Sequence, residues 1–188
     1  DHTTVAIRGT NCVALVTQKK VVDKLIDPSS VTHMFQITEK IGCVLTGRDS
    51  DSRALATQAR AEASEFRYNH GYAMPVHVLA KRMADLAQVY TQQAGRRAYA
   101  AMMILCAVDE ERGPSLYKVD PAGHYFGYKA VAAGTKYQEA MTRLEKRVKA
   151  NPEGGDENET IQAAIEELQH VLSADFKNSE IEVGVIIE

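Results

Sequence analysis

Two adjacent threonines, Thr3 and Thr4, stand at the start of the first apolar stretch of the chain. A threonine hydroxyl can act as a catalytic nucleophile when the free amine of the same, first residue takes up its proton. Both threonines follow another residue here, so each nitrogen belongs to a peptide bond. Threonine is also β-branched, which suits a strand. The pair is therefore either a displaced nucleophile or an ordinary strand opening.

The composition indicates one folded domain and excludes several classes of function. The chain has 188 residues, 45% of them hydrophobic, which is enough for one packed core. A net charge of −3 argues against nucleic acid or an anionic membrane as the main partner. No apolar run approaches the roughly 20 residues of a membrane-spanning helix. We expect neither a metal nor a cofactor, because the histidines lack metal-ligand spacing.

Cysteine usage indicates a reducing compartment. The three cysteines are an odd number, and none belongs to a C-x-x-C pair. Each lies inside an apolar, strand-like run, so we expect small buried thiols that stay reduced. These residues are Cys12, Cys43 and Cys106.

The elements that must position these residues alternate in blocks along the chain. Strand-like runs come first, then two long helices, more strands, two further helices and a last strand. Such an order predicts an α+β fold, a four-layer αββα sandwich of two antiparallel sheets flanked by helices. The expected strands are 5–8, 12–17, 34–37, 41–46, 100–108, 115–119, 125–132 and 181–187, and the first helix runs from Asp49 to about residue 69.

One segment carries a family resemblance. "VDPAGHYFGYKAVAAG", residues 119–134, closely resembles the signature of proteasome α-type subunits, and "LEK" at 144–146 and "VYTQ" at 89–92 are similar to the same family. "VTQKKV" and "EKIGCVLTG" resemble its type-1 branch, called type 6 in the mammalian scheme. The resemblance covers essentially the whole chain. The signature residues are Asp120, Pro121, Ala122, Gly123, Tyr125, Tyr128, Lys129 and Ala130.

The resemblance implies a role in architecture rather than in catalysis. Members of this family form the outer seven-membered ring of the 20S core particle, which serves ubiquitin-dependent protein degradation in cytoplasm and nucleus. The expected partners are neighbouring α subunits, β-ring subunits, and the C-terminal tails of regulatory-particle ATPases or other activators. The expected roles are ring assembly, gating of substrate entry and docking of these regulators.

The same resemblance offers an enzymatic alternative, an active β-type N-terminal threonine hydrolase. That site needs a first-residue threonine, a lysine and an aspartate. Aligned by their shared strand pattern, the threonine position holds His2, the lysine position holds His33 and the aspartate position holds Gln18, so we expect no catalysis. The alternative requires Thr3 as a processed first residue. Its lysine and aspartate would have to come from Lys19, Lys20 and Asp23.

A further rival is a free-standing domain that binds a small molecule. Nothing in the sequence supplies the Gly-rich phosphate loop of such a domain. The resemblance instead implies that residues 1–188 form one α-type domain that lacks the family's N-terminal ring-top helix with its gate segment, and its C-terminal extension.

The resemblance also implies a pocket for regulator tails. In the family, a lysine there pairs with the tail carboxylate, and its position holds His33 in this sequence. Imidazole is mostly neutral near pH 7 and is a weaker carboxylate partner than ammonium. We expect a weakened pocket in which Arg48 substitutes for the lysine.

Overall fold

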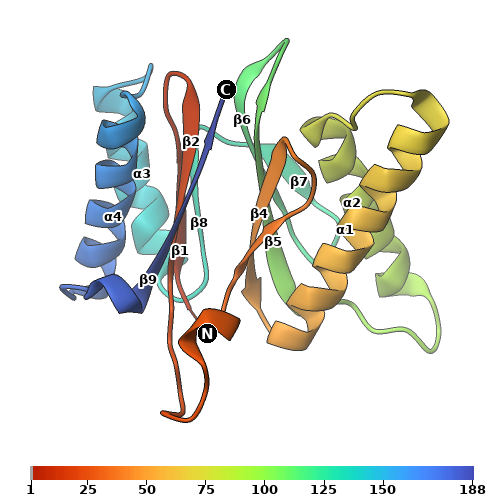
Figure 1. Cartoon of the computed structure of the whole chain (residues 1–188), viewed down its shortest axis with the longest axis horizontal. Helices are drawn as coiled ribbons and strands as arrows, with labels where there is room; N and C mark the ends of the chain where they lie inside the picture. The colour runs from red at the N-terminus through yellow and green to blue at the C-terminus, as the bar shows by residue number, and fades with distance from the viewer. Residues whose placement is uncertain (1) are drawn as a thin grey trace.

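The computed structural model describes residues 2–188 and folds them into four layers (Figure 1). Two antiparallel sheets lie face to face, and a pair of helices covers the outer side of each sheet. The predicted α+β sandwich is therefore confirmed. The helices are α1 (Asp49–His70), α2 (Val76–Gln92), α3 (Tyr137–Ala150) and α4 (Glu157–Leu172), with short 3-10 turns at Pro28–Ser30 and Asn178–Glu180.

The four-stranded sheet packs against α3 and α4. Across this sheet the order is β8 (Ala130–Ala133), β1 (Thr4–Arg8), β2 (Cys12–Gln18) and β9 (Ile181–Ile187), and all neighbours are antiparallel. The β1 and β2 strands are apolar almost throughout, because one face packs on the helices and the other on the second sheet. Continuous apolar sequence is typical of strands buried on both faces.

The five-stranded sheet packs against α1 and α2. It contains β3 (Met34–Gln36), β4 (Ile41–Gly47), β5 (Ala101–Asp109), β6 (Gly113–Val119) and β7 (Tyr125–Gly127), in chain order across the sheet. Each strand is antiparallel to the next, so short turns suffice except between β4 and β5, where both helices intervene.

The predicted continuous strand 125–132 is wrong in one respect. The structure splits it into β7 and β8, which belong to different sheets. Between them the backbone N–H of Tyr128 still bonds to Leu116 O of β6, whereas Lys129 O already accepts from Arg8 of β1. The segment changes sheets within two residues, and hydropathy cannot reveal this because it does not show which neighbouring strand each half pairs with.

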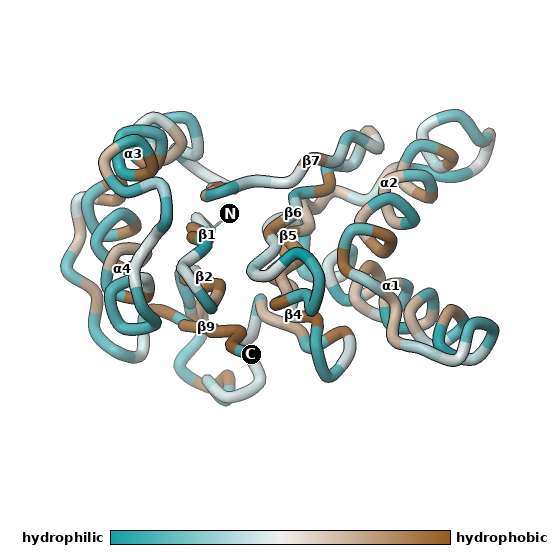
Figure 2. The backbone as a smooth tube through the Cα atoms, turned by 90° about the horizontal axis from the view of Figure 1, so that it is seen from above, coloured by the Kyte–Doolittle hydropathy of each residue, from teal (hydrophilic) through white to brown (hydrophobic). Residues whose placement is uncertain are grey.

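The C-terminal end of α1 lies at the glycine that the sequence predicts, whereas its N-cap differs from the predicted residue. It ends at Gly71, whose φ of 80° is the left-handed geometry that glycine permits. Its N-cap is Arg48, and Asp49, expected to be a capping residue, is instead the first helical residue. Figure 2 views the layers from above and shows teal and brown alternating along the helices, as expected when one face of each is apolar.

Three apolar clusters hold the layers together. One lies under α1 and α2 and includes Leu79 and Met83, a second lies under α3 and α4 with Leu144 and Leu168, and a third fills the space between the sheets. All three cysteines are free and buried, as predicted. Among the helices of residues 2–188, none combines the length and apolarity needed to cross a membrane.

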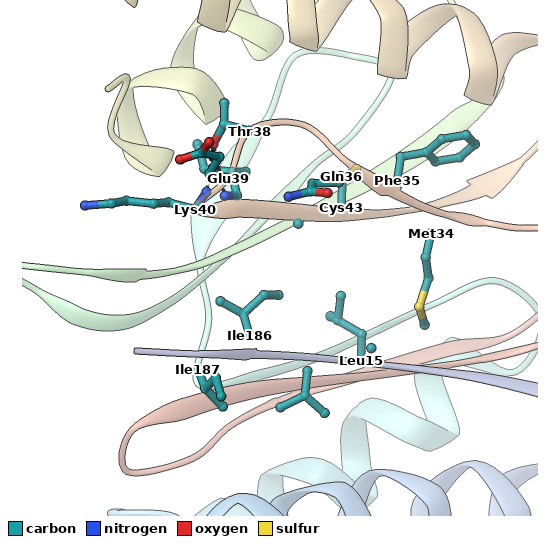
Figure 3. A pocket seen from close by; sticks show the side chains of 14 residues that line it. Leu15, Met34, Phe35, Gln36, Thr38, Glu39, Lys40, Cys43, Ile186 and Ile187 are labelled. Atoms are coloured by element: carbon teal, nitrogen blue, oxygen red, sulfur yellow. Dashed lines mark hydrogen bonds between the residues drawn. The ribbon is translucent and has the colours of Figure 1, made fainter. Parts of the chain in front are cut away.

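The space between the sheets opens at the edge formed by β3 and β9. There a cavity of about 380 Å³ separates Met34 and the turn after β3 from Leu15 and Ile186 (Figure 3). The close-up shows mostly aliphatic groups on the β9 side, and on the β3 side the polar side chains of Gln36 and of the 38–40 turn. Nothing in this lining converges as catalytic groups would.

Candidate functional site

The hydroxyl of Thr3 is buried and fully engaged. Its Oγ1 donates to Thr135 O at 2.7 Å, and its backbone N–H donates to Gln18 Oε1 at 2.9 Å. The side chain has no exposed surface. An attacking threonine needs a free amine and access to a substrate, and this residue has neither.

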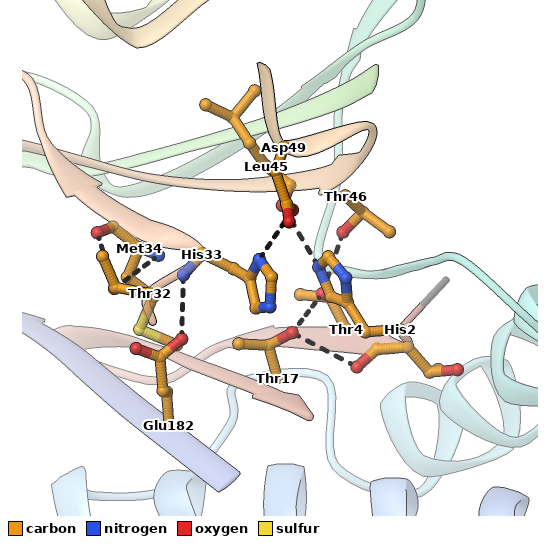
Figure 4. A network of polar contacts seen from close by, with 11 residues as sticks. His2, Thr4, Thr17, Thr32, His33, Met34, Leu45, Thr46, Asp49 and Glu182 are labelled. Carbon is orange, nitrogen blue, oxygen red and sulfur yellow. Dashed lines mark hydrogen bonds and ion pairs between the residues drawn. The ribbon is translucent and has the colours of Figure 1, made fainter. Parts of the chain in front are cut away.

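The hydroxyl of Thr4 joins the two sheets. Its Oγ1 shares hydrogen bonds with Thr17 Oγ1 on β2 (2.8 Å) and Thr46 Oγ1 on β4 (2.9 Å), and Thr17 also donates to Thr3 O at 3.4 Å (Figure 4). We call Thr4, Thr17 and Thr46 the threonine cluster. All three residues are buried, and every hydroxyl has a partner, as buried polar groups require. The cluster is a structural link, not a reactive site.

The structure brings the three aligned positions together at this end of the sandwich. The His2 ring stacks on His33, with ring centroids 3.7 Å apart and an interplanar angle of 19°, and His2 Nε2–H donates to Leu45 O at 3.2 Å (Figure 4). Burial, and then the neighbouring His33, lowers the pKa of His2 from 6.5 to about 4. Gln18 lies beside them through its bond to Thr3.

The three positions aligned with a nucleophile, its lysine and its aspartate thus hold a neutral imidazole, a second imidazole and an amide. None of these groups is a hydroxyl or thiol paired with a base, so the arrangement cannot carry out covalent catalysis. The structure brings the three aligned positions together, but the sequence gave no sign that the two rings would stack.

His33 lies in a pocket of about 170 Å³ formed by residues 30–33, Phe35 and the start of α1. Its backbone N–H donates to Glu182 Oε2 on β9 at 3.0 Å, and its Nδ1 lies 3.9 Å from Asp49 Oδ1. The His33 side chain is 11% exposed and that of Asp49 is 80% exposed. The pocket also contains Ser52, whose buried Oγ has no partner within residues 2–188.

The other expected pocket residue lies at its border. Arg48 is exposed and anchors the start of α1 through its backbone, whose N–H donates to Ala100 O at 2.9 Å. It is not among the residues that line the His33 pocket. The lining includes Asp49 and Arg53, which the sequence analysis did not assign to the pocket. Their position at the start of the helix that follows β4 was the signal in the sequence that could have identified them.

The signature segment begins with a turn that Asp120 organises. Its Oδ1 accepts from the backbone N–H groups of Ala122 (3.0 Å) and His124 (2.9 Å), and its Oδ2 lies 3.1 Å from His124 Nδ1. Gly123 has a φ of 93° and lies so close to α2 that a Cβ would meet Gln88 Cβ at 2.7 Å. The turn, which also contains Pro121, therefore needs glycine both for its conformation and for its contact with α2.

The rest of the signature packs or crosses between the sheets. Tyr125 packs against the cluster under α1 and α2, Tyr128 packs between the sheets, and Ala130 is buried at the start of β8. Lys129 is exposed at the crossing. These positions serve turn geometry and packing, and no catalytic group lies among them.

Comparison with known proteins agrees with this inert geometry. The family described as "Proteasome subunit" matches residues 2–186. A "Probable proteasome subunit alpha type-1" of Schizosaccharomyces pombe is 51% identical over 184 residues, which cover 98% of this chain and 75% of that protein. "Proteasome subunit alpha type-6" of Caenorhabditis elegans is 40% identical over 184 residues, covering 98% and 74%. "Proteasome subunit alpha type-2-A" of Arabidopsis thaliana is 33% identical over 185 residues, covering 98% and 77%.

The chain therefore belongs to the proteasome subunit family. It is an α-type subunit, the non-catalytic kind that forms the outer ring of the 20S core particle, and it assembles with other proteasome subunits. The enzymatic alternative, a β-type hydrolase acting through Thr3, is ruled out by this membership and by the buried, fully bonded hydroxyl.

Proposed function

We propose that this subunit forms one wall of a seven-membered outer ring, with neighbouring α subunits on both sides and a β ring beneath it. In this role it supports ring assembly, limits substrate entry and takes part in docking of regulatory particles for ubiquitin-dependent degradation. The single observation that carries the proposal is the stacked His2–His33 pair, a packed and unreactive filling where a hydrolase would hold its nucleophile. We place the particle in the cytoplasm and nucleus, and three free, buried cysteines are consistent with these reducing compartments.

The proposal includes a weak pocket for regulator tails at His33. A tail carboxylate entering from outside would meet a side chain that is only 11% exposed, beside the exposed carboxylate of Asp49. Like charges repel at short range, and a histidine ring lacks the fixed charge of an ammonium. Arg48, one residue before Asp49, is the nearest candidate for a compensating cation along the chain.

The test uses assembled core particles that carry single substitutions in this chain, with binding of a regulator-tail peptide as the readout. We expect His33→Lys to strengthen binding by about tenfold, the factor of one charge-assisted hydrogen bond. Asp49→Asn should strengthen it by a smaller factor, and Arg48→Gln should weaken it. Lys146→Gln, on the exposed side of α3, is the matched control.

Equal affinities for all four variants would remove the tail pocket from the proposal. A gain for Asp49→Asn together with no loss for Arg48→Gln would keep the pocket but reject the role of Arg48. Cross-linking of the same particles identifies the neighbouring α and β subunits. Fluorescence microscopy of the tagged chain checks whether the particle occurs in both cytoplasm and nucleus.

A further inference from the structure

A second cavity lies at the edge of the inter-sheet space opposite to that of Figure 3, where β7 passes over to β8. Its volume is about 410 Å³. We call it the Lys118 cleft. Side chains of β5, β6 and β7 line one side, and the end of β8 with the first residue of α3 lines the other. The lining residues are Met102, Lys118, Asp120, His124, Phe126, Tyr128, Ala133, Gly134 and Tyr137.

The ammonium group of Lys118 is the unusual feature of this cleft. The side chain reaches from β6 across to the other sheet, where Nζ donates to Ala132 O at 3.3 Å and lies 5.2 Å from the centre of the Tyr137 ring. Within residues 2–188 no carboxylate lies within ion-pair distance of this nitrogen. An ammonium has three donors, so at least one is directed to something that these residues do not provide.

The acidic residue in the lining does not fill this gap. Both carboxylate oxygens of Asp120 are engaged with its own turn, through the backbone N–H groups of Ala122 and His124 and through the His124 ring. Partial burial lowers the pKa of Lys118, and distant Asp120 only partly opposes this effect. Taking an ammonium out of water without a counter-charge is costly, and proteins normally pair such groups.

The surroundings of the ammonium are apolar and aromatic. Phe126 is 63% exposed and Tyr137 is 44% exposed, which is high for side chains of this size beside a cavity. An exposed aromatic rim around a partly buried cation is typical of a protein contact site rather than of a solvated surface. The matching partner therefore carries a carboxylate on a short apolar segment, with the acid reaching Lys118 and the apolar groups covering Phe126.

We propose that the Lys118 cleft receives an acidic side chain of an adjoining proteasome subunit and that Lys118 forms an interface ion pair with it. The inference rests on the assignment to a ring of subunits, and the cleft opens at the edge of the sandwich where β7 passes over to β8. It is a different surface from the His33 pocket, since the two share no lining residue.

The experiment treats purified core particles with a water-soluble carbodiimide, which joins an ammonium and a carboxylate that are already in contact. Peptide mass spectrometry then identifies the residue linked to Lys118. We expect an amide link between Lys118 and an aspartate or glutamate of another subunit, and its loss in particles that carry Lys118→Met. In parallel, acetylation of Lys118 in the intact particle should be about tenfold slower than that of exposed Lys146, a factor within the range of one charge-assisted hydrogen bond.

The cross-linking and acetylation results distinguish an acidic residue of another subunit from an internal partner and from an open cleft. A link from Lys118 only to Asp120 or to another residue of this chain would overturn the proposal in favour of an internal partner. Acetylation at the same rate as Lys146, without any link, would show an open cleft and overturn it as well. Both results leave ring membership intact, whereas absence of this chain from purified particles would overturn the ring assignment and this inference together.

Discussion

The threonine cluster and the Lys118 cleft both place polar side chains across the gap between the two sheets, with opposite outcomes. In the cluster, hydroxyls from β1, β2 and β4 satisfy one another and no water is needed. In the cleft, the ammonium crosses the same gap and finds one carbonyl and one aromatic face. A polar group whose hydrogen bonds are all made within the chain stabilises the fold. A polar group at an edge that lacks such partners indicates a contact with another molecule.

The largest effect should come from breaking the cluster. Thr4→Val removes the hydroxyl that both Thr17 and Thr46 contact, and so leaves two buried hydroxyls with a lost partner. We expect the free energy of unfolding to fall by about 2–3 kcal/mol. Denaturant titration measures the change. Thr142→Val on the exposed face of α3 is the control and should stay within about 0.5 kcal/mol. A loss below that bound for Thr4→Val would contradict the structural role of the cluster.

The stacked rings beside the cluster should make stability depend on pH. The pKa of His2 is about 4 in the folded chain against 6.5 for an ordinary histidine, so the unfolded chain binds this proton first. The contribution of His2 is therefore complete above about pH 6.5 and is lost as the pH falls toward 4. The slope is at most about 1.4 kcal/mol per pH unit. His2→Leu should flatten the profile in this window, and an unchanged slope would show that the ring is not buried as described.

Asp51 is a buried acid outside both regions, and its hydrogen bonds should make stability depend on pH in a more acidic range than His2 does. Two bonds from Arg97, at 2.7 and 2.8 Å, and one from the backbone N–H of Ala100 hold the pKa of Asp51 well below its usual value. Its contribution is present above about pH 4 and declines as the pH falls below that value. Acid titration should show a shallower loss below pH 4 for Asp51→Asn than for the parent chain. Parallel curves would contradict the pairing.

The smallest effect is expected in the cleft. Lys118→Met replaces a partly desolvated ammonium by an apolar group of similar length, and the free chain loses only one long hydrogen bond. The free energy of unfolding should therefore stay within about 0.5 kcal/mol of the parent value. A loss comparable to that of Thr4→Val, measured by the same denaturant titration, would mean that Lys118 acts in the fold and would erase the contrast between the two regions.

Much of the fold could be predicted from the sequence, because the apolar runs of β1, β2 and β5 and the helical stripes of α2 and α4 are long and regular. The split of 125–132 could not, since a change of sheet depends on tertiary hydrogen bonds such as that from Tyr128 N–H to Leu116 O. The start of α1 was placed within one residue, and the choice of Arg48 as N-cap depends on its backbone contact with Ala100.

The candidate site was predictable only as a set of positions. Alignment by strand pattern singled out His2, Gln18 and His33 as one set, and the structure brings them together. The Asp49 carboxylate beside His33 and the unpaired state of Lys118 were not predictable. Both depend on distances between segments far apart in the chain, which periodicity does not contain.

The pairing of the four-stranded sheet also determines when it can form during synthesis. The five-stranded sheet uses residues 34–127 alone, so all of its strands have left the ribosome while the β1–β2 hairpin still waits for both neighbours. Thr4 has to pair with Ala133, and Cys12 with Ile187. β1 and β2 therefore leave the ribosome well before both of their neighbours are made, and until then their apolar faces remain exposed on the nascent chain.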